Sequence, residues 1–251
     1  MTANLLILGG TTEATRLAEA VAAIGAPATL SYAERVARAR EAPLPVRVGG
    51  FGGPCGLADY IQRERVSHVI DATHPFAAQM SENAAIGARE AGVPLVALTR
   101  PPWRPIAGDD WVRAGDIEAA VAALEGPARR VMLAIGRLDI DEFAAQPQHH
   151  YLLRLVAPPT TPPDLPNHEI IISRGPFTAM GDTKLFADHG IEVVVAKNAG
   201  GADAAAKLAA ARALGLKVVL IDRPPQPERE EVSSVEAVFA WLKGRGVDLG
   251  V

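Results

Sequence analysis

The chain has 251 residues, of which 49% are hydrophobic, 22% charged and 5% aromatic, and its formal net charge is −4. This balance is typical of a globular protein, and the length allows one large domain or two modest ones. The low aromatic content and the lack of a basic excess argue against nucleic acid as a partner. The single cysteine, Cys55, excludes an internal disulfide framework and a zinc site built on cysteines.

Targeting and metal-binding patterns are missing from the sequence. Residues 1–25 do not resemble a signal peptide, and no apolar run approaches the roughly 20 residues of a membrane span. We therefore expect a cytoplasmic protein without a membrane partner. We also expect a monomer or a weak oligomer. His149 and His150 are adjacent and cannot form an H-x-x-x-H pair, so we predict no metal site.

The first element follows from the apolar run Leu5–Leu8, which predicts a buried parallel strand. Gly9 and Gly10 then turn the chain, and Thr11 or Thr12 can cap the helix that follows. Free N–H groups and the positive end of a helix dipole can bind a phosphate there. Against the G-x-G-x-x-G fingerprint, Thr11 replaces the middle glycine, and its hydroxyl could donate to a pyrophosphate. An ordinary strand–helix turn remains the alternative.

Strands and helices alternate along the rest of the chain. In the first half, the pattern predicts strands at residues 28–33, 46–51, 68–72 and 94–100, and helices at 57–64 and 75–90. The proline-rich segment 101–105 interrupts the alternation, and we place a domain boundary between it and about residue 115. In the second half, we expect strands at 130–135, 151–156, 170–173, 192–196 and 217–221, and helices at 117–124, 140–145, 178–188, 203–214 and about 235–242.

This alternation predicts an α/β fold of two Rossmann-like lobes with parallel sheets and a cleft between them. Residues 1–110 would form the N-terminal lobe that binds the nucleotide. Residues 111–251 would form the C-terminal lobe that closes the substrate cleft.

The end of the second predicted strand bears on the choice of nucleotide. An acidic residue at this point favours NAD, whereas arginine favours the additional phosphate of NADP. Ser31 ends the strand and Arg35 follows four residues later, which favours NADP. Glu34 could instead bind a ribose, and Arg35 could be an ordinary solvated residue. Both alternatives stay open.

Missing motifs exclude three common enzyme classes. The sequence contains no Y-x-x-x-K pair of a short-chain dehydrogenase, no P-loop and no G-x-S-x-G elbow. His74 follows the fourth predicted strand, where it could take part in the chemistry or could merely pin the turn.

Several motifs together resemble the precorrin-6A reductase family of cobalamin biosynthesis, from Leu5 to about Trp241. The specific ones are D-A-T-H-P-F-A at residues 71–77 and K-N-A-G-G at residues 197–201. Further matching segments are residues 6–14, G-G-F-G-G at 49–53, residues 80–83, R-P-P-W at 100–103, Lys207, residues 210–212 and residues 223–224.

The resemblance implies an oxidoreductase that uses NADPH to reduce one double bond of the metal-free corrin precursor precorrin-6A, giving precorrin-6B. The partner would be this small tetrapyrrole. The cobalt-containing counterpart of the anaerobic route is the first alternative. A tetrapyrrole methyltransferase and a non-catalytic protein that binds an anionic ligand are the others.

The site residues that we expect fall into three groups. NADPH would be bound by Gly9, Gly10, Thr11, Thr12, Glu13, Ser31, Arg35, Thr73, His74 and Pro75. The substrate carries many carboxylates, so a negatively charged protein needs cationic and polar residues at the cleft, and the candidates are Arg100, Arg137, Arg174, Lys184, Lys197 and Asn198. His74 and Lys197 are the catalytic candidates and would meet across the cofactor, although solvent or a substrate carboxyl could supply the proton instead.

Overall fold

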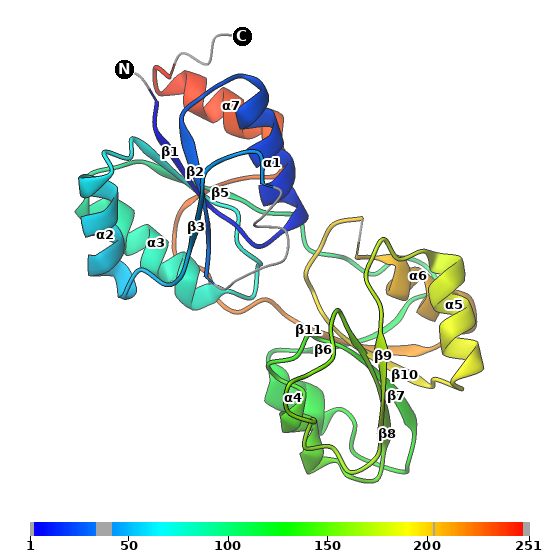
Figure 1. Cartoon of the computed structure of the whole chain (residues 1–251). Coiled ribbons are helices and arrows are strands. Elements are labelled where there is room, and N and C mark those ends of the chain that lie inside the picture. The colour runs from blue at the N-terminus through cyan, green and yellow to red at the C-terminus, as the bar shows by residue number, and fades with distance from the viewer. Residues whose placement is uncertain (1–2, 34–41, 203, 248–251) are drawn as a thin grey trace. The chain divides into compact units, whose positions relative to one another are not determined.

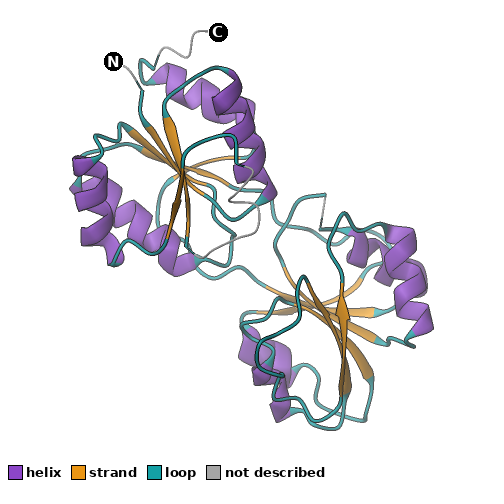
Figure 2. Cartoon of the chain, viewed as in Figure 1, coloured by secondary structure: helices purple, strands orange, loops and turns teal. Residues whose placement is uncertain are grey.

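The computed structural model describes residues 3–33, 42–202 and 204–247. The chain divides into two compact units, one of Met1–Arg100 with Pro225–Val251 and one of Pro101–Pro224. Each unit has a six-stranded sheet with helices on its faces (Figure 1, Figure 2). The predicted α/β class with two parallel sheets is confirmed, while the cleft between the lobes stays a prediction.

The sheet of the first unit has the strand order β12-β5-β4-β1-β2-β3, and every neighbouring pair is parallel. Its strands are β1 (Leu5–Leu8), β2 (Ala28–Tyr32), β3 (Val46–Val48), β4 (His68–Asp71), β5 (Leu95–Leu98) and β12 (Glu230–Val232). Its helices are α1 (Thr12–Ala23), α2 (Gly53–Arg63), α3 (Ala78–Glu90) and α7 (Val235–Gly244). In such an order the chain reverses its winding between β1 and β4, which is where doubly wound sheets bind ligands.

Strand β1 lies at the centre of this sheet because its side chains pack in two hydrophobic cores, one on each face of the sheet. Leu5 and Ile7 pack in the cluster that contains α1 and α7, whereas Leu6 and Leu8 pack in the cluster with α2 and α3. Side chains of a strand alternate between the two faces, so a strand covered on both faces must be apolar throughout. Each such buried side chain contributes about 1.5–3 kcal/mol, which fixes β1 between the helical layers.

The sheet of the second unit has the order β6-β11-β10-β7-β8-β9 and is also parallel. Its strands are β6 (Asp110–Ala114), β7 (Arg130–Ala134), β8 (His150–Leu155), β9 (His168–Ile172), β10 (Val193–Lys197) and β11 (Lys217–Ile221). Its helices are α4 (Ile117–Ala122), the 3-10 helix η2 (Asp141–Ala145), α5 (Ala179–Asp188) and α6 (Ala206–Leu214). No helix in the described part of the chain is long and apolar enough to cross a membrane.

Two of the edge strands, β6 and β12, are absent from the sequence-based prediction, which also assigns residues 225–251 to the second lobe. The chain instead returns to the first unit at Pro225, where β12 pairs with β5 and α7 joins the core beside α1. Edge strands are short and often charged, as Glu230 and Glu231 of β12 are. Because they lack an apolar run, the hydrophobic pattern does not reveal them.

The segment after β4 also differs from the prediction. Helix α3 begins at Ala78, whereas the sequence places Pro75 in its first turn. Residues His74–Ala77 form a turn in which Ala77 N donates to His74 O over 2.7 Å. This turn brings the D-A-T-H-P-F-A motif to the carboxyl edge of the first sheet.

Gly200→Ala is expected to destabilise the second unit. Gly200 has a φ of +71°, and a Cβ at this position would overlap the carbonyl oxygen of Pro101. Backbone strain and overpacking should lower the free energy of unfolding by about 2–4 kcal/mol, measured by urea denaturation. Gly115→Ala is the control, because a Cβ there meets nothing within 4 Å. Equal stability of the two variants would show that the close approach to Pro101 is not required.

Candidate functional site

Three segments meet at the carboxyl edge of the first sheet. Leu8, the last residue of β1, is in register with Ser31 of β2 and with Asp71 of β4. Gly9 N donates to Ser31 O over 2.8 Å, and Ala72 N donates to Leu8 O over 2.9 Å. The glycine turn after β1 therefore lies between the end of β2 and the loop after β4.

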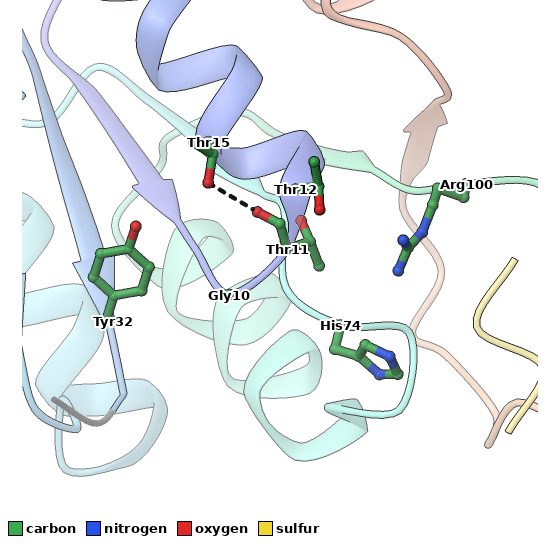
Figure 3. Close-up of a pocket in the computed structure, with 7 residues that line it drawn as sticks. All are labelled: Gly10, Thr11, Thr12, Thr15, Tyr32, His74 and Arg100. Carbon is green, nitrogen blue, oxygen red and sulfur yellow. Dashed lines mark hydrogen bonds between the residues drawn. The ribbon is translucent and has the colours of Figure 1, made fainter. Parts of the chain in front are cut away.

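A pocket of ≈ 230 Å³ opens at this junction, and Figure 3 shows the side chains around it. It is lined by Gly10, Thr11, Thr12, Thr15, Tyr32, His74 and Arg100. Whole ligand sites usually measure about 300–1,000 Å³, so the pocket is large enough for part of a dinucleotide.

The two glycines of the turn serve different purposes. A Cβ on Gly9 would lie 2.9 Å from Leu30 Cδ1 and 3.0 Å from Tyr32 Cε1, so a larger residue would have to displace these side chains of β2. Gly10 has a φ of +136°, and the position of its missing Cβ is open space. A ligand can therefore approach the backbone closely at Gly10.

Thr11 is the N-cap of α1, as the sequence allows, and its hydroxyl is fully engaged. Thr11 Oγ1 accepts from Ala14 N at 3.1 Å and donates to Ala72 O at 2.8 Å. The hydroxyl thus ties the turn after β1 to the segment after β4. Because its proton is used within the protein, Thr11 can offer a phosphate its backbone N–H rather than its hydroxyl.

The N-terminus of α1 has the groups that a dinucleotide needs. The N–H groups of Thr12 and Glu13 lie in the first turn of α1, where no intrahelical acceptor exists. Glu13 Oε2 is buried and has no hydrogen-bond partner among the described residues, although Arg100 Nη1 lies 3.6 Å away. The N–H groups suit a diphosphate, and the carboxylate of Glu13 is paired with Arg100, which lines the pocket.

The loop after β4 is held by a buried carboxylate. Asp71 Oδ1 accepts from Thr73 N at 3.1 Å and from Thr73 Oγ1 at 2.7 Å. Asp71 Oδ2 accepts from Ser81 Oγ and from Arg229 Nη1, both at 2.6 Å. The side chains of Asp71 and Arg229 are only 1% and 6% exposed. This network fixes the backbone that leads to His74.

His74 and its neighbours complete this wall of the pocket. His74 Nδ1 accepts from Phe76 N at 3.2 Å, so the neutral ring carries its proton on Nε2. Pro75 O accepts from Gln226 Nε2 at 3.0 Å. Of the three residues expected here, His74 lines the pocket, while the Thr73 hydroxyl and the Pro75 carbonyl bond within the protein.

The end of β2 brings in an arginine that the sequence analysis does not single out. Ser31 is buried, and its Oγ accepts from Nη1 of Arg47 on β3 over 3.3 Å. Arg35 lies outside the described residues. The position of Arg47 two residues before the G-G-F-G-G segment is the sequence feature that could have drawn attention to it.

In the second unit, Lys197 lies at a comparable junction. It ends β10 and forms an ion pair with Asp139, which follows the neighbouring strand β7. Both side chains are partly buried, at 16% and 28% exposure. Arg137 also follows β7, and Arg174 follows β9, where its Nε donates to Val156 O at 3.1 Å.

Two other residues expected to bind substrate have different surroundings. Asn198 is buried, accepts from Trp103 N at 2.8 Å and donates to Trp103 O at 3.2 Å, so its amide holds the R-P-P-W segment. Lys184 lies on the exposed surface of α5, where it pairs with Asp188 at 2.7 Å. Among the described residues, no group of three or more His, Cys, Asp or Glu could hold a metal ion.

Comparisons of the sequence and of the structure with known proteins agree on one family. Residues 4–243 match the family described as precorrin-6x reductase CbiJ/CobK. A precorrin-6A reductase of Rhodobacter capsulatus is 56% identical over 97% of each chain, and one of Sinorhizobium sp is 44% identical over 95% of this chain and 94% of the relative. A cobalt-precorrin-6A reductase of Priestia megaterium is 28% identical over 88% of this chain and 90% of the relative. The solved structure named CobK precorrin-6A reductase superposes with a TM-score of 0.93, at 55% identity and 98% coverage of both chains.

Arg229→Gln is expected to destabilise the first unit strongly. The change leaves the Asp71 carboxylate buried without its cation, which typically costs about 3–5 kcal/mol in the free energy of unfolding. Arg63→Ala is the control, because Arg63 is 65% exposed and its pair with Glu64 should contribute less than about 1 kcal/mol. Denaturant titration of both variants measures the difference. Wild-type stability of Arg229→Gln would contradict a supporting role for the ion pair.

Proposed function

Because the chain belongs to the precorrin-6x reductase CbiJ/CobK family, we propose that it reduces one double bond of precorrin-6A to give precorrin-6B, with NADPH as the reductant. The chain is an oxidoreductase. The observation that carries the proposed substrate is the 56% identity over nearly the whole chain to a relative named precorrin-6A reductase.

The pocket of the first unit is the proposed NADPH site. When bound, NADPH supplies a hydride, and the protein has to bind and orient it and exclude water. The N–H groups of Thr12 and Glu13 would bind the diphosphate at the positive end of α1. Gly10 lets the cofactor approach the backbone.

His74 and Lys197 are the proposed catalytic residues. The position of His74 in the pocket, with Nδ1 accepting from Phe76 N, supports a role for Nε2–H in holding the nicotinamide or donating a proton. The charge of Lys197 at the end of β10 supports a role in binding a substrate carboxylate. In a chain of net charge −4, cations near strand ends, such as Arg137 and Arg174, would add to this binding.

The cobalt-containing form of the substrate is the second candidate. Relatives named cobalt-precorrin-6A reductase match the chain at 28% identity or less, half the 56% of the relative from Rhodobacter capsulatus. The difference in identity favours the metal-free substrate.

Purified protein should oxidise NADPH in the presence of precorrin-6A. The loss of NADPH absorbance measures this oxidation. The kcat/KM should be higher with precorrin-6A than with its cobalt complex, and higher with NADPH than with NADH. A protein that binds NADPH but leaves precorrin-6A unchanged would contradict the proposed substrate. A preference for the cobalt complex would favour the second candidate.

His74→Ala and Lys197→Ala should each lower kcat/KM without unfolding the protein. A proton-transfer role predicts a loss of about 10²-fold or more in kcat for His74→Ala. Loss of a charge-assisted contact predicts that Lys197→Ala raises KM for precorrin-6A by about 10-fold or more, with little change in the NADPH Kd. Steady-state kinetics with a thermal melt of each variant measures these effects.

Lys217→Ala is the matched control for the lysine. Lys217 lies at the start of β11 with 43% of its side chain exposed, so its removal should leave the kinetics unchanged. Wild-type kcat/KM in His74→Ala or in Lys197→Ala would contradict the role of that residue.

A further inference from the structure

Arg47 lies beside the end of β2, which adjoins the proposed NADPH pocket. It occupies the middle of β3, in register with Ser31 of β2, and its Nη1 donates to Ser31 Oγ over 3.3 Å. Tyr32, the next residue of β2, lines the pocket, and its carbonyl accepts from Gly49 N at 2.8 Å. The guanidinium is thus attached to the edge of the sheet on which the pocket opens.

The G-G-F-G-G segment fixes the guanidinium in place. Nη1 also donates to Gly49 O, and Nη2 donates to Gly50 O over 2.7 Å. Cζ of Arg47 lies 3.7 Å from the centre of the Phe51 ring, so the group is stacked on an aromatic face. Gly49 has a φ of +121°, a conformation that favours glycine. An arginine fixed in this way needs little further ordering to bind an anion.

The charge of Arg47 is not balanced by a carboxylate in the described part of the chain. Arg100 and Arg229, by comparison, pair with Glu13 and Asp71. Arginine has five N–H donors, and the three acceptors named above use three of them. Both a positive charge and donors therefore remain for an anionic ligand.

We propose that Arg47, together with Ser31, binds the 2′-phosphate of NADPH and sets the preference of this site for NADPH over NADH. In doubly wound folds the adenosine ribose lies at the end of the second strand, where Ser31 lies. A 2′-phosphate requires a cation at this point, and guanidinium groups bind phosphate bidentately. The inference rests on the proposed function and gives the G-G-F-G-G segment a purpose, which is to orient this guanidinium.

The test is calorimetric titration of the substrate-free protein with NADP⁺ and with NAD⁺. The wild-type protein should bind NADP⁺ more tightly. In Arg47→Ala the ratio of the two Kd values should fall by about 10- to 100-fold, almost entirely through weaker NADP⁺ binding. Arg63→Ala is the matched control, since both Arg47 and Arg63 lie over the Tyr60 ring but Arg63 is 65% exposed, and the ratio should stay unchanged.

Arg47→Lys provides a second variant if a thermal melt shows that Arg47→Ala does not fold. The lysine ammonium keeps the positive charge but cannot donate to the carbonyls of Gly49 and Gly50 and to a phosphate at the same time. The ratio of the two Kd values should therefore lie between those of the wild type and Arg47→Ala. Equal weakening of NADP⁺ and NAD⁺ would overturn the inference and leave Arg47 as a support of the loop. A preference lost in Arg35→Ala but kept in Arg47→Ala would also overturn it. Failure of the wild type to bind either nucleotide would refute the proposed function itself.

Discussion

The buried ion pair between Asp71 and Arg229 joins the loop after β4 to the C-terminal part of the first unit. Asp71 is 1% exposed and accepts four hydrogen bonds, so its charge is compensated where water cannot reach it. The backbone that it holds continues into His74 and into the carbonyl of Pro75, which accepts from Gln226. One wall of the proposed cofactor pocket therefore depends on residues about 150 positions further along the chain.

The opposite wall depends on the turn after β1. The Thr11 hydroxyl joins this turn to Ala72, so the two sides of the pocket are connected by a direct hydrogen bond. Because the hydroxyl is used in this way, the proposed contact with a diphosphate falls to the backbone N–H groups of α1. The threonine that replaces a glycine of the dinucleotide fingerprint thus contributes to the junction of two strands, while Gly10 keeps the approach to the backbone open.

Local sequence patterns predict the parts of the fold that are themselves local. The apolar run of β1, the cap at Thr11 and the alternation of strands and helices are read from neighbouring residues, and the structure confirms them. The pattern misses β12 because two of its three residues are glutamates. It also misses the contacts of Arg229 with Asp71 of β4 and of Arg47 with Ser31 of β2, since only the folded chain brings these residues together. Asn198 is a different case: the structure shows its amide bonded to the backbone of Trp103, which the sequence does not reveal, while its role in binding substrate stays a prediction. The family itself could be recognised because D-A-T-H-P-F-A and K-N-A-G-G are specific, and several of their residues serve to hold loops.

Hydrogen–deuterium exchange of the protein with and without NADPH tests the position of the cofactor most directly. Binding at the carboxyl edge of the first sheet predicts slower exchange of backbone amides in residues 9–14 and 72–77, with the largest change at the start of α1. Protection confined to residues 101–224, with these two segments unchanged, would contradict the assignment of the pocket as the NADPH site.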